Sequence, residues 1–260
     1  MELAIVISVA LAGSFLSFFT GFGLGTLLLP AFMLVFPPHI AIAATAVVHL
    51  LNNIFKLFLV GRYADRSIIF TFGALSVVGA IGGALLLDVM MNTGTLVSYS
   101  IGHHVFEITW IKLVIAILIL VFSLLETLPV FNSLEMPRNW LPAGGLLSGF
   151  FGGLSGHQGA LRSAFLMKAG LSKEAFMGTR VVCAVMVDVS RIAVYSTQMG
   201  YLAGGWNEID PIIIIVATLA ALTGAYLGNR YMKKSTLKWI QNLVTVSLVL
   251  FALALGAGLI

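Results

Sequence analysis

Charged side chains are scarce in this sequence, and their scarcity excludes an ordinary soluble fold. Only 9% of its 260 residues are charged, whereas 60% are hydrophobic. Soluble domains carry about 25% charged residues, so this chain has too few to cover a globule in water, and it is too apolar for intrinsic disorder. The alternating pattern of a membrane β-barrel is missing too. The composition therefore predicts an all-α polytopic membrane protein.

Cysteine and nucleotide-binding motifs are also lacking. The single cysteine, Cys183, lies in an apolar run, which excludes a disulfide framework and a multi-cysteine metal site. No GxxxxGK[ST] motif is found, so any energy for transport comes from a gradient. There is no His-x₃-His pair or nucleophile triad, so we expect no enzyme, no cofactor and no metal. The net charge of +4 lies mostly in short loops, which indicates membrane orientation and no nucleic acid.

Apolar runs predict six full spans and two broken hairpins. A span needs about 20 apolar residues, and the runs that fit are 39–60, 67–91, 109–128, 172–197, 209–232 and 236–259. The remaining runs form two pairs, 3–36 and 140–170, which are interrupted by glycine-rich breaks at 21–25 and 152–159. Non-helical backbone at membrane depth must be buried in protein or line a cavity. Each pair is therefore predicted to be a hairpin that enters and leaves on one side.

The distribution of Lys and Arg predicts the orientation. Loops 61–66 and 229–238 contain Lys or Arg, whereas loops 92–108 and 198–210 contain neither. The positive-inside rule places the basic loops in the cytoplasm. Both termini then lie outside, and the N-terminus, which has no basic n-region, is expected to be a retained helix rather than a signal peptide.

The two halves of the chain resemble each other. Residues 31–34 (AFML) match 164–167 (AFLM), and 45–48 (TAVV) match 179–182 (TRVV). We predict a first repeat at 1–128, a cytoplasmic linker at 129–139 and a second repeat at 140–260. Each repeat holds one hairpin and three spans, so the repeats must be inverted, which is a transporter architecture. An old duplication without a transport role is the alternative.

Polar side chains cluster inside two equivalent spans, where they are costly and mark functional sites. One stripe holds Thr45, His49, Asn52, Asn53 and Lys56, and the other holds Arg180, Asp188, Arg191 and Tyr195. Lys56 is interpreted as an interfacial anchor. Arg191 is expected to snorkel or to pair with Asp188 one helical turn away.

The second break adds the features of an anion site. His157, Gln158 and Arg162 lie at the break and at the start of the following half-helix, whose N-terminus carries partial positive charge. An arginine fork suits oxyanions. The first break would present the opposing helix N-terminus. The predicted substrate-binding residues are Gly23, Gly25, His49, Asn52, Asn53, Gly156, His157, Gln158, Gly159, Arg162 and Arg180.

These motifs resemble a known family. The GFGLG run followed by Pro30, the second glycine-rich break, and the spans with Gly79 and Gly224 are similar to the TauE/SafE family of sulfite exporters and organosulfonate permeases. The resemblance covers nearly the whole chain and implies a carrier of sulfur-containing anions in the bacterial inner membrane, with periplasmic termini. The family's second break usually carries plainer residues than His157, Gln158 and Arg162, which favours an anion with more charge or more oxygens here.

The sequence thus predicts a secondary transporter that exports a small sulfur oxyanion, such as sulfite or an organosulfonate, by alternating access. An anion channel, a proton-coupled uptake carrier for another small organic anion, and a membrane-embedded enzyme are the alternatives. The expected partners are the anion, protons if His49 or His157 couples transport to them, and membrane lipid. Small-residue faces such as Gly79-x₃-Gly83 would also permit a homodimer.

Overall fold

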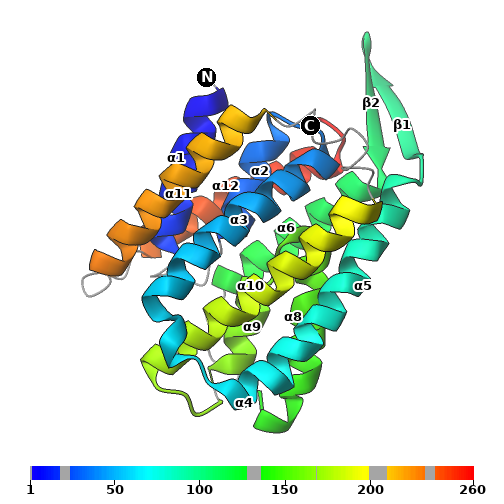
Figure 1. Ribbon diagram of the computed structural model, residues 1–260. Helices are drawn as coiled ribbons and strands as arrows, with labels where there is room; N and C mark the ends of the chain where they lie inside the picture. Colours follow the sequence, from blue (N-terminus) through cyan, green and yellow to red (C-terminus); the bar gives the residue numbers. More distant parts are fainter. Residues whose placement is uncertain (1, 18–23, 128–135, 168, 199–209, 232–237) are drawn as a thin grey trace.

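The computed structural model describes residues 2–17, 24–127, 136–167, 169–198, 210–231 and 238–260, and most of them are helical (Figure 1). The longer helices are α1 (Glu2–Leu16), α2 (Leu24–Met33), α3 (Pro38–Val60), α5 (Ala74–Met91), α6 (Trp110–Thr127), α8 (Leu141–Ser155), α9 (Gly159–Leu166), α10 (Lys173–Gln198), α11 (Pro211–Tyr231) and α12 (Lys238–Gly256). Short helical pieces are η1 (Gly61–Tyr63), α4 (Arg66–Ile68), η2 (Ile69–Gly73) and η3 (Arg138–Trp140).

Several of these helices have the length and apolar character of membrane spans. Among the described residues, Pro38–Tyr63, Arg66–Met91 and Pro211–Arg230 are long and apolar enough to cross a bilayer. The shorter apolar helices are Leu3–Leu16, Leu24–Met33, Trp110–Leu125 and Asn242–Gly256. Together they support the prediction of a helical membrane protein.

A β-hairpin is the exception to the all-α prediction. Strands β1 (Thr95–Ile101) and β2 (His104–Thr109) pair antiparallel within the stretch that we expected to be an irregular loop. β-Branched and aromatic residues favour strands, and the rings of Tyr99 and Phe106 stack with centroids 5.4 Å apart. Gly102 supplies the positive φ of 63° at the turn. In Figure 1 the hairpin projects from the end of the bundle where both termini lie.

The second glycine-rich break is narrower than predicted. Helix α8 continues through Gly152 and Gly153, and only residues 156–158 separate it from α9. Helices accommodate glycine when a neighbouring backbone packs against it, and that is the case for Gly153, where an added Cβ would lie 2.0 Å from the Ala80 carbonyl oxygen. Residues 18–23, which include Gly21 and Gly23 of the first break, lie outside the described part of the chain.

Helix pairs from the two halves pack closely against each other. α3 packs on α10, α5 on α8, α1 on α11 and α6 on α12, and Figure 1 shows α3 and α10 running antiparallel through the middle of the bundle. The α5–α8 contact depends on glycine, because a Cβ on Gly79 would lie 2.1 Å from the Leu146 carbonyl oxygen. A Cβ on Gly224 would likewise collide with the Leu11 carbonyl oxygen of α1. These small-residue faces therefore allow close packing between helices of the same chain.

Adjacent glycines on α5 provide a matched test of this packing. In Gly83→Ala the new methyl would lie 2.0 Å from the Phe150 carbonyl oxygen, whereas in Gly82→Ala the nearest atom would be 4.0 Å away. Overpacking costs about 1–3 kcal/mol, so Gly83→Ala should lower the melting temperature in detergent while Gly82→Ala leaves it unchanged or slightly raised. Equal melting temperatures would contradict the described α5–α8 contact.

Candidate functional site

The two helix breaks meet in the interior of the bundle. Gly25 lies in the first turn of α2, and a Cβ built on it would be 3.3 Å from the carbonyl oxygen of Gly156, the residue that ends α8. Gly156 has a φ of 85° and its N–H donates to the Gly152 carbonyl at 2.9 Å. A side chain at Gly156 would be strained in this conformation and would collide with Arg191.

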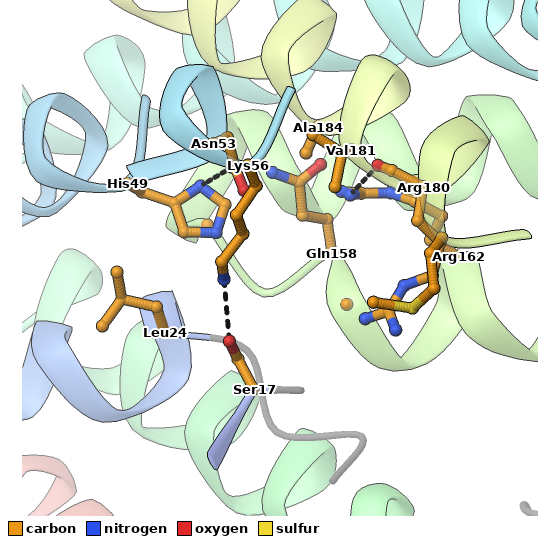
Figure 2. Close-up of a pocket in the computed structure, with 13 residues that line it drawn as sticks. Ser17, Leu24, His49, Asn53, Lys56, Gln158, Arg162, Arg180, Val181 and Ala184 are labelled. Carbon is orange, nitrogen blue, oxygen red and sulfur yellow. Dashed lines mark hydrogen bonds between the residues drawn. The ribbon is translucent and has the colours of Figure 1, made fainter. Parts of the chain in front are cut away.

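A small cavity of about 60 Å³ lies beside this contact (Figure 2). One buried water needs roughly 15 Å³ by the same kind of measure, so the cavity has room for a few waters or one small ion. Its walls come from the two breaks and from α3 and α10. The lining residues are Ser17, Leu24, His49, Asn53, Lys56, Gly156, Gln158, Gly159, Arg162, Met177, Arg180, Val181 and Ala184.

A helix N-terminus borders the cavity, because Gly159 begins α9 and lies in the lining. The first N–H groups of a helix have no partner within the helix, and they carry roughly half a positive charge. This end of α9 therefore favours a negative charge in the cavity.

Arg162 is the buried cation at the start of α9, with only 4% of its surface exposed. Its Nη1 donates to the Arg180 carbonyl oxygen at 2.9 Å, which fixes the guanidinium against α10. Its Nε and Nη2 atoms find no hydrogen-bond acceptor among the described residues. A buried charged donor without an acceptor is costly. A ligand that supplies oxygen acceptors to Nε and Nη2 would remove this cost.

Lys56 is a second buried cation in the cavity wall, where the sequence suggested an interfacial anchor. Its Nζ donates to Ser17 Oγ at 2.8 Å. With the Asn52 amide oriented so that its nitrogen faces Ser14 and Ala221, Asn52 Oδ1 accepts from Lys56 Nζ at 3.1 Å. The signal for this position was in the sequence, since Lys56 follows His49 and Asn52 on one helical face.

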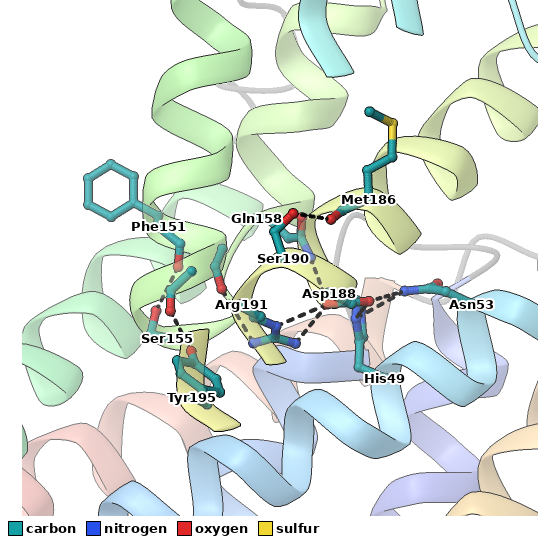
Figure 3. A network of polar contacts seen from close by, with 12 residues as sticks. His49, Asn53, Phe151, Ser155, Gln158, Met186, Asp188, Ser190, Arg191 and Tyr195 are labelled. Atoms are coloured by element: carbon teal, nitrogen blue, oxygen red, sulfur yellow. Dashed lines mark hydrogen bonds and ion pairs between the residues drawn. The ribbon is translucent and has the colours of Figure 1, made fainter. Parts of the chain in front are cut away.

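Asp188 is the centre of a buried network that joins the two halves (Figure 3). Its Oδ2 accepts from His49 Nδ1 at 2.7 Å and from Asn53 Nδ2 at 2.9 Å. Its Oδ1 accepts from Gln158 Nε2 at 3.3 Å and pairs with Arg191, whose Nε and Nη2 lie 3.1 and 2.8 Å away. Arg191 is fully buried, so it does not snorkel.

The charge balance around the cavity is positive. Lys56, Arg162 and Arg180 line it, whereas no carboxylate appears among the described lining residues. The nearby carboxylate of Asp188 is already neutralised by Arg191. The positively charged lining would attract an anion into the cavity.

The structure brings seven of the predicted site residues together around the cavity. His49, Asn53, Gly156, Gln158, Gly159, Arg162 and Arg180 line the cavity. Asn52 lies behind Lys56, Gly25 lies at the contact between the breaks, and Gly23 is outside the described residues.

Two polar side chains at the second break do not suit the role of anion ligands in this arrangement. His157 lies away from the cavity, where its ring stacks on Phe122 and its Nδ1 is 2.9 Å from Ser155 Oγ. The amide nitrogen of Gln158 donates to Asp188, and its remaining polar atom, Oε1, can only accept a hydrogen bond. Sequence spacing places such residues near the break but does not determine which way each side chain turns.

The Asp188–Arg191 pair predicts a specific pattern of stability. Asp188→Asn leaves the Arg191 charge buried without its counter-ion, which costs about 3–5 kcal/mol. The double variant Asp188→Asn/Arg191→Gln removes both charges and should recover most of the loss, as measured by thermal unfolding in detergent. A double variant no more stable than the single one would show that the ion pair does not govern this centre.

Comparison with known proteins identifies the family of the chain. The model of the sulfite exporter TauE/SafE family matches residues 5–255, nearly the whole chain. Neither the curated proteins nor the solved structures give a match. The helical membrane architecture and the cation-lined cavity are consistent with a family of membrane transporters for sulfite and related sulfur compounds. The chain belongs to the sulfite exporter TauE/SafE family.

Proposed function

We propose that this protein is a secondary transporter that exports a small sulfur-containing oxyanion, such as sulfite or an organosulfonate, across the bacterial inner membrane. The observation that carries the proposal is the buried Arg162 guanidinium, which borders the cavity with two N–H-bearing atoms that no described residue accepts from. Family membership supports the class of substrate.

The chemistry of Arg162 suits an oxyanion better than other small solutes. A guanidinium is planar and presents paired donors that match two oxygens of one anion. Because Nη1 is held on the Arg180 carbonyl, the remaining donors are fixed in direction before the ligand arrives. The N-terminus of α9 adds backbone donors on the same side. A cation would meet repulsion here, and a neutral solute would leave the positive charge uncompensated.

Lys56 and Arg180 extend the site to the opposite wall. Lys56 comes from α3 and Arg180 from α10, so cations from both halves surround one cavity. A ligand with charge spread over several oxygens would contact both halves at once. The small volume favours a compact anionic head group over a bulky one.

Alternating access is supported by helix contacts that recur between corresponding helices of the two repeats. We propose repeats at 1–128 and 140–260 joined by the linker 129–139. If α1 corresponds to α8 and α5 to α11, then the pairs α1–α11 and α8–α5 are equivalent, and both are close contacts. The antiparallel α3 and α10 fit an inverted relation (Figure 1). Rocking of one repeat against the other would then expose the cavity to each side in turn.

Export is supported by the membrane potential, and the basic residues indicate which end of the bundle faces the cytoplasm. Arg62, Arg66 and Arg230 are exposed and lie in η1, in α4 and in the last turn of α11, and Figure 1 shows α4 at the end of the bundle opposite the termini. The positive-inside rule puts that end in the cytoplasm and the termini in the periplasm. The interior-negative potential would then favour anion exit by about 2.3 kcal/mol per charge per 100 mV.

Arg162→Gln tests the proposed site, with Arg230→Gln as a matched control on an exposed arginine. Loss of the buried charge-assisted hydrogen bonds should weaken sulfite binding at least about thirtyfold, corresponding to about 2 kcal/mol, while Arg230→Gln binds like the wild type. Sulfite affinity is measured from ligand-induced thermal stabilisation of the purified protein in detergent. Wild-type affinity in folded Arg162→Gln would contradict the site, and absence of sulfite-dependent stabilisation in the wild type would contradict the function.

A further inference from the structure

We propose that His49 is a proton-binding site in the cavity, so that the protein binds a proton together with its anion. The inference rests on the proposed function, because it concerns the same cavity. It starts from the position of His49 at the middle of α3, 11 residues from either end of the helix. At 1.5 Å per residue this is about 17 Å from each end, so the imidazole lies deep in the bundle and still faces the cavity.

The hydrogen bonds of His49 determine which ring nitrogen can take up the proton. Nδ1 lies 2.7 Å from Asp188 Oδ2 and 3.0 Å from Asn53 Nδ2, which donates to the same carboxylate oxygen. An ionised carboxylate only accepts, so Nδ1 carries the hydrogen and Nε2 of the neutral ring keeps its lone pair. No described residue forms a hydrogen bond with Nε2. The ring is thus oriented by Asp188, with a basic nitrogen left for the cavity (Figure 2).

The charges that face His49 oppose one another and make its protonation depend on the ligand. Asp188, 2.7 Å from the ring, attracts a positive charge on the imidazole, whereas the Arg191 guanidinium paired with Asp188 and the Arg162 guanidinium in the cavity wall repel one. Lys56 on the same helix and Arg180 on α10 are the other cations of the cavity. The described lining residues of the first break, Ser17 and Leu24, are uncharged. Without an anion, a further positive charge meets repulsion from the cations.

A bound anion reverses this balance. A proton from water adds to the Nε2 lone pair, and the resulting N–H can donate to an oxygen of the anion. No other reactant is needed, and Asp188 stays ionised. Because the anion favours the proton, the proton must favour the anion to the same extent.

His157 does not have the geometry for this role, which makes it the matched control. It is buried like His49, but its ring stacks on Phe122 and does not line the cavity. Neither Asp188 nor another carboxylate contacts it among the described residues. Removal of its titration should therefore leave the pH dependence of anion binding unchanged.

The test measures sulfite affinity between about pH 5.5 and 8.5, the range in which histidine titrates, for wild type, His49→Asn and His157→Asn. Asparagine at position 49 can still donate to Asp188 but has no counterpart of Nε2. Free sulfite also takes up a proton in this pH range, and this contribution to the pH dependence is the same for all three proteins. We expect the wild-type affinity to rise more steeply on acidification than that of His49→Asn, by up to about tenfold per pH unit. His157→Asn should follow the wild type.

Proton uptake on sulfite addition, recorded with a pH indicator in weak buffer, gives a second readout. Wild type and His157→Asn should take up close to one proton more per bound anion than His49→Asn. His49→Gln repeats the comparison if the asparagine variant fails to melt cooperatively. Equal pH profiles and equal uptake in all three proteins would overturn the proton site while leaving anion binding intact. Absence of sulfite binding to the wild type would instead overturn the proposed function.

Discussion

The buried carboxylate of Asp188 is the interaction on which the centre of this molecule depends. It lies on α10 and accepts hydrogen bonds from α3, from the second helix break and from Arg191. A buried ion pair is stable only when further hydrogen bonds satisfy both partners, and here His49, Asn53 and Gln158 supply them. The Nε and Nη2 atoms of Arg162 have no acceptor among the described residues, and they are the donors that we propose for a ligand.

Glycine makes this arrangement geometrically possible. Helices α5 and α8 approach so closely that side chains at Gly79, Gly83 and Gly149 would overlap the backbone of the neighbouring helix. The same holds at Gly156, where Arg191 Nη1 would lie 2.8 Å from an added Cβ. Close packing brings the ends of four half-helices to one place. The dipole of α9 and the buried cations then act on the same small volume.

Much of this architecture could be predicted from the sequence, because its signals are local. The predicted spans 39–60, 67–91 and 209–232 coincide with the three helical stretches that are long and apolar enough to cross a bilayer, and α8 and α9 fall inside the predicted 140–170. The β-hairpin at 95–109 is not visible in the pattern of apolar length and basic residues, because it lies in a stretch between two apolar runs that contains no Lys or Arg. Strand pairing depends on alternation across a turn, which a search for apolar runs does not detect.

The site was only partly predictable. Helical periodicity placed His49, Asn53 and Lys56 on one face, but it does not determine whether a long side chain such as Lys56 reaches the interface or turns inward. The structure shows it turned inward onto Ser17. Likewise, neighbouring positions in a break can face opposite ways, as His157 and Gln158 do. Such directions depend on tertiary contacts with helices that are distant in the sequence.

Crystals grown with selenate, an oxyanion whose selenium scatters anomalously, would test the central claim most directly. The anomalous difference map locates the anion without any assumption about the site. The account predicts a peak in the cavity, within hydrogen-bonding reach of Arg162 Nε or Nη2 and next to the N-terminus of α9. A peak confined to the exposed basic residues at the ends of the helices, with the cavity empty, would contradict it.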